Sequence, residues 1–254
     1  MTDIGTLNFL WSQAMVAGFV AAGVRRAVIS PGSRSTPLAL ALLRQSGLIC
    51  DVTVDERSAA FFALGIAKAS QRPVLLLATS GTAPANWMPA VMEANLSGVP
   101  LILISADRPP ELQACGANQT VDQVNLFGAQ VRASHALGVP HQGFDPAYLH
   151  RLAARVCEQA SWPHPGPVHL NQPFREPLLP LAETTEAGIP ETLCVAHPAL
   201  QPASEDIADL AKRISGRPGV IVCGEMRGRP ENGDAIAALA KRLNSPIIAE
   251  PLSG

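Results

Sequence analysis

Short apolar runs, each closed by a turn rich in proline, glycine or hydroxyl residues, recur along the first 180 residues. Each run is continuous and is followed by a segment with apolar residues at helical spacing, which is typical of strands buried on both faces of a parallel sheet. The predicted strands are 27–29, 49–54, 73–78, 100–105, 133–139 and 168–170. The main predicted helices are 7–22, 38–43, 58–67, a segment ending at 94, and 146–161. The pattern therefore predicts an α/β domain with a parallel six-stranded sheet and helices on both faces.

The remaining residues predict a second, smaller part. We expect residues 1–180 to form the first domain and 181–204, which lack periodicity and are rich in proline, to form a linker. Two helices and two strands follow over 205–254, as at the start of a second, Rossmann-like α/β domain. Two strands are too few for an independent core, so we expect this domain to be truncated.

Composition excludes several classes of protein. Hydrophobic residues make up 47% of the 254 residues and the net charge is −2, which argues against disorder, nucleic-acid binding and binding to anionic membranes. The five cysteines include no CxxC pair, as expected in a reducing cytosol. The uncharged segment 4–24 contains Asn8, Ser12 and Gln13, so we interpret it as a core helix and not a membrane span.

Three consecutive charges, Asp55, Glu56 and Arg57, separate a predicted strand from a helix that is apolar on all sides. Such a helix is expected to be buried all round. Ligands bind at the carboxyl ends of strands in open α/β sheets, and Glu56 lies at such an end. It also lies at a helix N-terminus, so two interpretations stay open: Glu56 is a functional carboxylate of a ligand site, or it only caps the helix.

Two arginines follow other strands: Arg34 after the first and Arg108 after the fourth. Together with Ser33 and the hydroxyl-rich turn 79–82 they suggest an anion site, because arginine binds carboxylates bidentately. The alternative is that Arg34 and Arg108 form structural ion pairs with Asp55 and Asp107. The long polar loop 111–128 is expected to be either functional or disordered.

No metal or phosphate-loop motif is present in the sequence. The six histidines lack metal-ligand spacing, and the GxxxxGK[ST] and HExxH patterns are absent. The turn 224–228 lacks the GxGxxG spacing, so we expect a close helix–strand contact there. We therefore predict no metal site in this chain.

Six ordered motifs, at 29–38, 55–59, 79–83, 106–109, 116–120 and 166–171, resemble the N-terminal part of one family of thiamine-diphosphate enzymes. This is the MenD family, the 2-succinyl-5-enolpyruvyl-6-hydroxy-3-cyclohexene-1-carboxylate synthases of menaquinone biosynthesis. Ser-Pro-Gly-Ser-Arg-Ser at 30–35 and Asp-Glu-Arg-Ser-Ala at 55–59 are the specific motifs; Thr-Ser-Gly alone would suit relatives of acetolactate synthase as well. The resemblance covers essentially the whole chain.

The resemblance implies a pyrimidine-binding domain for thiamine diphosphate and a role for each site residue. Glu56 would be catalytic, hydrogen-bonding the pyrimidine ring nitrogen and promoting its imino tautomer, with Thr82 and Gln119 as further cofactor contacts. The residues implied in substrate binding are Ser33, Arg34, Arg108, Asn118 and Gln119. The substrates would be 2-oxoglutarate, which is decarboxylated, and isochorismate, which accepts the resulting succinyl-semialdehyde carbanion.

The resemblance also implies partners that this chain lacks. The diphosphate and its Mg²⁺ or Mn²⁺ ion would be held by a further C-terminal domain, so the chain alone is expected to be inactive. A homo-oligomer, dimer or tetramer, would form the active site between subunits in the cytoplasm. Two alternatives remain open: another thiamine-diphosphate carboligase of the acetolactate synthase type, and a non-catalytic anion-binding module.

Overall fold

The computed structural model describes residues 3–180, 195, 200–225 and 231–253. The chain divides into two compact units, 1–196 and 197–254. The predicted linker 181–204 falls mostly on residues outside those described, so the predicted domain boundaries stay a prediction.

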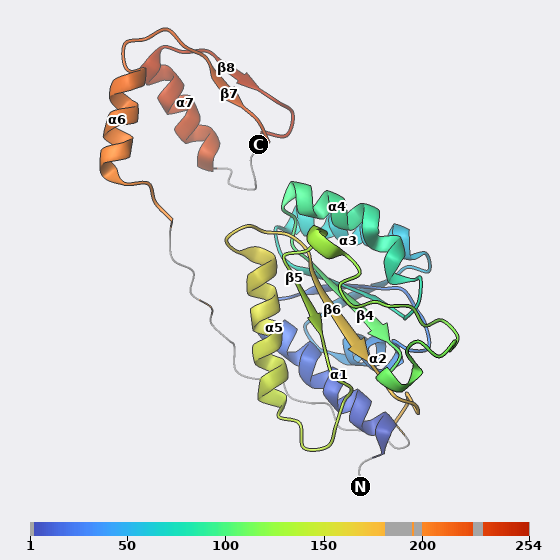
Figure 1. The fold of residues 1–254 in the computed structure, drawn as a ribbon. Helices are drawn as coiled ribbons and strands as arrows, with labels where there is room; N and C mark the ends of the chain where they lie inside the picture. The colour runs from blue at the N-terminus through green and yellow to red at the C-terminus, as the bar shows by residue number, and fades with distance from the viewer. Residues whose placement is uncertain (1–2, 181–194, 196–199, 226–230, 254) are drawn as a thin grey trace. The chain divides into compact units, whose positions relative to one another are not determined.

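The first unit is built on a six-stranded sheet in which every neighbouring pair is parallel, as predicted (Figure 1). Its strands lie in the order β2-β1-β3-β4-β6-β5. The strands are β1 (Arg26–Ile29), β2 (Ile49–Val52), β3 (Val74–Ala78), β4 (Leu101–Asp107), β5 (Ala133–Ala136) and β6 (Val168–Pro173). Strand β6 runs three residues beyond its predicted end, which brings Asn171 and Gln172 into the sheet next to β4.

Helices cover both faces of this sheet (Figure 1). The helices are α1 (Ile4–Ala21), α2 (Thr36–Arg44), α3 (Glu56–Ser70), α4 (Met88–Ser97) and α5 (Pro146–Ser161), with 3-10 turns at Pro84–Trp87, Pro110–Leu112 and Gly128–Gln130. α1, α2 and α5 form one layer, and α3 and α4 form the other. Successive strand residues alternate between the layers: Leu75 and Leu77 pack in the first, Leu76 in the second.

Helix α1 is the central helix of its layer. It is long and apolar enough to cross a membrane, but 83% of that segment is buried inside the unit, which confirms the interpretation as a core helix. Two of its buried side chains donate hydrogen bonds to the segment around β6. Trp11 Nε1 donates to Gln172 Oε1 at 2.8 Å, and Asn8 Nδ2 donates to the Arg175 carbonyl at 2.8 Å.

Helices α1 and α5 approach closely at Gly18. A Cβ at this position would lie 2.8 Å from the His150 Cα and 3.0 Å from the Ala153 Cβ. We therefore expect Gly18→Ala to lower the free energy of unfolding by about 1–3 kcal/mol, because the two backbones must separate. Urea unfolding followed by tryptophan fluorescence measures this, since the three tryptophans all lie in the first unit.

Gly65 provides the matched control. It lies in the interior of α3, is exposed, and has no atom within 4 Å of an added Cβ. Gly65→Ala should raise stability by about 0.5–1 kcal/mol, because alanine loses less backbone entropy in a helix. Equal effects of the two substitutions would contradict the close helix contact.

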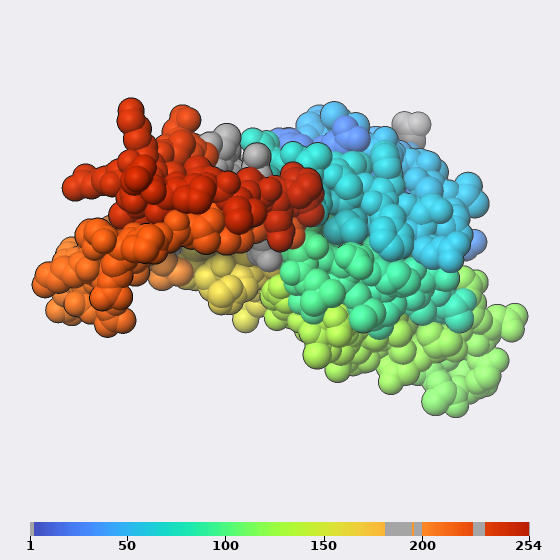
Figure 2. Space-filling view, turned by 90° about the horizontal axis from the view of Figure 1, so that it is seen from above, coloured from blue at the N-terminus to red at the C-terminus, as the bar shows by residue number. Residues whose placement is uncertain are grey.

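The expectation that α3 is buried on all sides is wrong. Its small residues Ala59, Ala60 and Ala63 pack into the core, but Phe61 and Phe62 are 43% and 46% exposed. On α4, Met92 and Leu96 are likewise exposed. Figure 2 looks onto this side of the unit, where light-blue to blue-green atoms of α3 and α4 form the surface. The apolar helix α3 therefore buries one face, made of its alanines with Leu64 and Ile66 packed against the same cluster, and leaves Phe61 and Phe62 exposed.

The second unit contains two parallel strands, each preceded by a helix. The elements are α6 (Ser204–Ile214), β7 (Ile221–Cys223), α7 (Glu231–Leu243) and β8 (Ile247–Ala249). These match the four predicted elements. Val222 and Ile248 are 66% and 58% exposed, so the faces of this small sheet are poorly covered among the described residues.

Candidate functional site

The strand order reverses direction between β1 and β3, and the loops that follow these two strands lie against each other. Gly32 leaves no space for a side chain, because a Cβ there would lie 2.4 Å from the Thr79 Cβ. Such a reversal point at the carboxyl ends of parallel strands is where open α/β sheets bind ligands. Arg34 is buried beside this point, whereas Ser33 and Thr82 are exposed in the two loops.

Glu56 lies at the carboxyl end of the neighbouring strand β2, as the first residue of α3, and is half-buried. The side-chain cap of α3 is Asp55, which accepts a hydrogen bond from the Ser58 amide at 2.7 Å. That bond lowers the pKa of the Asp55 carboxyl. Asp55 is therefore the N-cap residue, and Glu56 is an acidic residue in the first turn of α3, so both interpretations of Glu56 stay open.

Arg34 is 5% exposed, and its partners follow strand β6. Its Nη1 donates to the Phe174 carbonyl at 2.9 Å, and its Nη2 forms an ion pair with Glu176 Oε1 at 2.7 Å. The structural alternative predicted pairing with Asp55 and is wrong, because Asp55 instead caps α3. Residues 174–176 were not expected to contribute to the site.

Arg108 extends from the end of β4 and is half-buried. Its Nη1 donates to Ser80 Oγ in the turn after β3. Its backbone amide donates to Asp107 Oδ1 at 2.7 Å. The contact with Asp107 is therefore made by the backbone of Arg108 and is not the predicted ion pair of its guanidinium. Burial and the nearby positive charge of Arg34 lower the pKa of Arg108.

Gln119 is held against the same turn. Its Nε2 donates to the Ser80 carbonyl at 3.0 Å, and Ser80 Oγ donates to the Gln119 carbonyl at 3.1 Å. Gly81 has a positive φ of 85°, and a Cβ there would lie 2.6 Å from Gln119 Cγ. The neighbouring Asn118 is exposed. Ser80 thus joins two predicted site residues, Arg108 and Gln119, although the sequence singled out only its turn.

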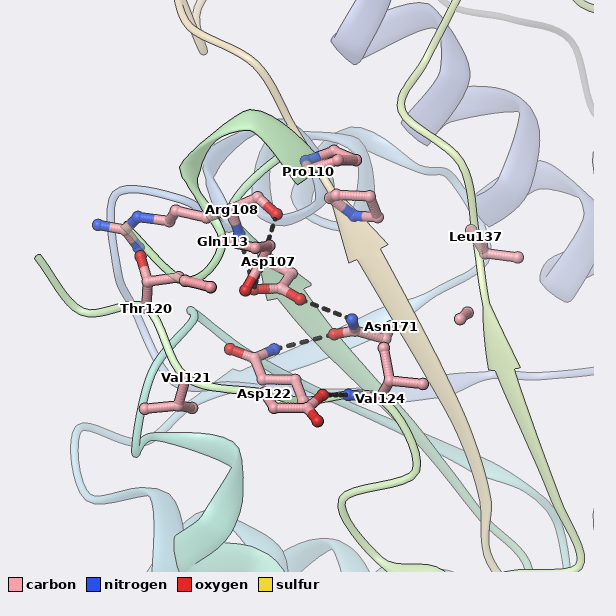
Figure 3. Close-up of a pocket in the computed structure, with 14 residues that line it drawn as sticks. Asp107, Arg108, Pro110, Gln113, Thr120, Val121, Asp122, Val124, Leu137 and Asn171 are labelled. Carbon is pink, nitrogen blue, oxygen red and sulfur yellow. Dashed lines mark hydrogen bonds between the residues drawn. The ribbon is translucent and has the colours of Figure 1, made fainter. Parts of the chain in front are cut away.

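A buried polar network underlies this site, and sequence reasoning missed it. Gln123 has no exposed surface; its Oε1 accepts from the Gly81 amide at 2.7 Å, and its Nε2 donates to Asn171 Oδ1 at 2.9 Å. Asn171 Nδ2 in turn donates to Asp107 Oδ2 at 2.7 Å (Figure 3). Burial raises the pKa of Asp107, although its hydrogen bonds from Asn171 and Arg108 oppose this.

The network continues into the core through Ser105 and His169. Ser105 Oγ lies 2.8 Å from His169 Nε2 and donates to Asn171 Oδ1 at 2.7 Å. His169 is fully buried, with its ring edge-to-face against Phe127 at 4.9 Å between centroids. Burial, reinforced by the charge of His135, lowers the pKa of His169 to about 4. The imidazole is therefore neutral at physiological pH.

A pocket of about 530 Å³ opens beside this network at the carboxyl ends of β4 and β6 (Figure 3). Its polar lining includes Asp107, Arg108 and Asn171. Its apolar lining includes Pro110, Val121, Val124 and Leu137.

The structure thus joins Arg34, Arg108 and Gln119 to one set of strand ends, and places Ser33, Thr82 and Asn118 on exposed loops next to them. Glu56 lies at the end of β2, the strand that pairs with β1. Among the described residues, no group of three or more histidine, cysteine or acidic side chains could hold a metal ion. The arrangement suits an anionic ligand near the arginines.

Comparison with known proteins agrees with this architecture. Residues 11–126 match the family described as thiamine pyrophosphate enzyme, N-terminal TPP binding domain. The chain is 69% identical over its whole length to the 2-succinyl-5-enolpyruvyl-6-hydroxy-3-cyclohexene-1-carboxylate synthase of Dechloromonas aromatica, and covers 47% of that protein. It is 46% identical to the synthase of Geobacillus kaustophilus and 44% identical to that of Myxococcus xanthus, covering 43% and 45% of them. The chain therefore spans about half the length of the curated relatives it matches.

Proposed function

We propose that this chain, which corresponds to the N-terminal portion of the 2-succinyl-5-enolpyruvyl-6-hydroxy-3-cyclohexene-1-carboxylate synthases, supplies the pyrimidine-binding half of a thiamine-diphosphate active site. The observation that carries the proposal is the identity of 69% over the entire chain. The arginines at the strand ends support it, because the proposed substrates are carboxylates. Residues 1–180 would form this domain, 181–204 a linker, and 205–254 the start of a central domain.

In this proposal Glu56 receives the pyrimidine ring of the cofactor. When bound, thiamine diphosphate supplies a carbon nucleophile that attacks a keto group. The side chain at this position fits such a ring, because Glu56 offers a half-buried carboxylate at the carboxyl end of β2 and is not the N-cap of α3. Glu56 would hold a proton at the ring nitrogen, and Thr82 and Gln119 would flank the cofactor.

The arginines would bind substrate carboxylates. The reaction joins 2-oxoglutarate, after loss of carbon dioxide, to isochorismate, and both substrates are dicarboxylic acids. Arg34 and Arg108 extend from different strands, and the charge of Arg34 acts on Arg108. Two neighbouring positive charges make the electrostatic potential between them favourable for an anion. Ser33, Asn118 and Gln119 would complete the substrate contacts with neutral hydrogen-bonding groups.

The rest of the active site would come from outside this chain. The diphosphate and its Mg²⁺ or Mn²⁺ ion need oxygen ligands that we assign to a further domain. The exposed apolar side chains of α3 and α4 support a homo-oligomer, dimer or tetramer, in which a partner covers this surface. The free cysteines 50, 115, 157 and 223 accord with a cytoplasmic enzyme.

The experiment that tests the proposed function is a product assay. The full-length protein that carries this chain is supplied with thiamine diphosphate, Mg²⁺, 2-oxoglutarate and isochorismate. We expect carbon dioxide release and formation of the cyclohexene carboxylate adduct, both dependent on isochorismate and cofactor. An adduct formed with pyruvate in place of 2-oxoglutarate would favour the acetolactate-synthase-type alternative, and ligand binding without turnover would favour the anion-binding module.

Arg34→Lys is expected to raise KM for a dicarboxylate substrate about tenfold or more, although the charge is kept. Lysine lacks the planar fork that binds a carboxylate through two parallel hydrogen bonds, and it also loses the contact with the Phe174 carbonyl. Steady-state kinetics on the full-length enzyme, with each substrate varied in turn, measures the effect. Unchanged KM values for both substrates would show that Arg34 does not bind either substrate.

A further inference from the structure

The guanidinium of Arg34 is only partly used by its protein neighbours. Nη1 and Nη2 each donate one hydrogen bond, to the Phe174 carbonyl and to Glu176. Its buried Nε has no hydrogen-bond partner among the residues that the structure describes. A buried donor without a partner is costly, so this N–H marks a place where an acceptor is expected to bind.

Glu176 contacts Arg34 through one oxygen, and its side chain is 70% exposed. An exposed carboxylate gains little from an ion pair and can turn into water at small cost. Arg34 cannot do the same, because its side chain is only 5% exposed. The two charges therefore differ in what they lose when the ion pair opens. The buried Arg34 would be left without a counter-ion, which is destabilising, whereas the exposed Glu176 would be hydrated by water.

A second guanidinium shares this environment. The pKa of Arg108 is lowered by burial and by Arg34, and the negative charges of Glu176 and Asp107 oppose that shift. The two arginines and Glu176 thus act on one another through a common electrostatic field. Asp107 is engaged by Asn171 and by the Arg108 amide, which leaves Glu176 as the exposed carboxylate of the group.

We propose that Glu176 is the resident counter-ion of Arg34 and that a carboxylate of the substrate displaces it. The incoming group would use the Nε and Nη2 donors together, a bidentate contact, where Glu176 uses Nη2 alone. Glu176 would then turn into solvent. This inference rests on the proposed function, since it takes the ligand to be a dicarboxylic acid, and it makes Glu176 a residue that sets the affinity for that acid.

The test is Glu176→Gln in the full-length enzyme. Glutamine keeps the size of the side chain and an oxygen that accepts from Nη2, but it removes the competing charge. We expect KM for at least one dicarboxylate substrate to fall about two- to fivefold, with kcat within about twofold of the wild type. A residue with a purely structural role would give no such tightening.

Glu111→Gln is the matched control. Glu111 is also a partly exposed glutamate, paired at 2.5 Å with Arg175, the residue before Glu176, so the substitution makes the same change in charge nearby. We expect unchanged KM values. If KM fell equally for both variants, the loss of a negative charge near the site would explain the effect without displacement of Glu176. That result would overturn the inference.

Two other results would also overturn it. A rise in KM for Glu176→Gln would mean that the carboxylate positions Arg34 or contacts the ligand directly, and unchanged KM values would mean that no displacement occurs. Arg34→Lys separates this failure from that of the proposed function. If Arg34→Lys raises KM while Glu176→Gln has no effect, only the displacement is wrong; if neither substitution matters, the arginine site itself is wrong.

Discussion

Replacing Glu56 by glutamine in the full-length enzyme is expected to lower kcat about 10²–10⁴-fold while the protein stays folded and still binds its cofactor. The amide matches the carboxylate in size, but it cannot exchange a proton with the pyrimidine nitrogen, and this is the usual contribution of one acid–base group. Glu56 is half-buried and is not the N-cap of α3, so we expect the amide to leave the helix intact. Steady-state kinetics with saturating cofactor measures the loss.

Asp55→Asn serves as the control for that experiment. Asparagine caps helices about as well as aspartate, so the hydrogen bond to the Ser58 amide is kept while the neighbouring negative charge is removed. We expect kcat within about threefold of the wild type for this variant. Activity of Glu56→Gln within a few-fold of the wild type would contradict the catalytic role of Glu56.

The second large effect concerns pH and stability. Burial lowers the pKa of His169 to about 4 in the folded chain, against an ordinary value of 6.5. The unfolded chain therefore binds one more proton between these values, and stability must fall as the pH falls through this window. At about 1.4 kcal/mol per tenfold change in proton affinity, His169 alone should lower the free energy of unfolding by about 3 kcal/mol between pH 7 and pH 4.

Urea unfolding at a series of pH values tests this contribution. The variant His169→Phe keeps a ring of similar shape but cannot be protonated, so its stability should change much less with pH than that of the wild type. His164→Gln is the control, because the side chain of His164 is exposed, and its pH dependence should match the wild type. Parallel pH profiles for the wild type and His169→Phe would contradict the buried, neutral imidazole.

The central strands of the sheet could be predicted from the sequence because β1, β3 and β4 contain continuous apolar runs, each closed by its own turn. Local patterns of this kind fix strand positions, and the helices between them require parallel pairing. The exposure of α3 could not be predicted in the same way. Phe61 and Ala60 are both apolar, and which of them contacts the sheet depends on the angle at which the helix packs. The sequence records hydrophobicity but not that angle.

The same limit applies to the site. Arg34, Arg108 and Gln119 were singled out because they follow strands or lie in motifs, and the structure joins Arg108 and Gln119 through Ser80. The role of Gln123 in the buried network was not predicted, because Gln123 is one of many polar residues in a long loop. Its role depends on contacts with Gly81 and Asn171, 42 and 48 residues away along the chain. Glu176 was missed because no local pattern pairs it with Arg34, 142 residues earlier.

The central claim is that Glu56 activates the bound cofactor, and the exchange of the cofactor's C2 proton with solvent deuterium tests it most directly. The rate can be followed by NMR after rapid acid quench, with full-length wild-type and Glu56→Gln enzyme saturated with thiamine diphosphate and Mg²⁺ but without substrate. We predict rapid exchange in the wild type and exchange about 10²-fold slower or more in the variant. Equal exchange rates with the cofactor bound in both proteins would contradict the role assigned to Glu56.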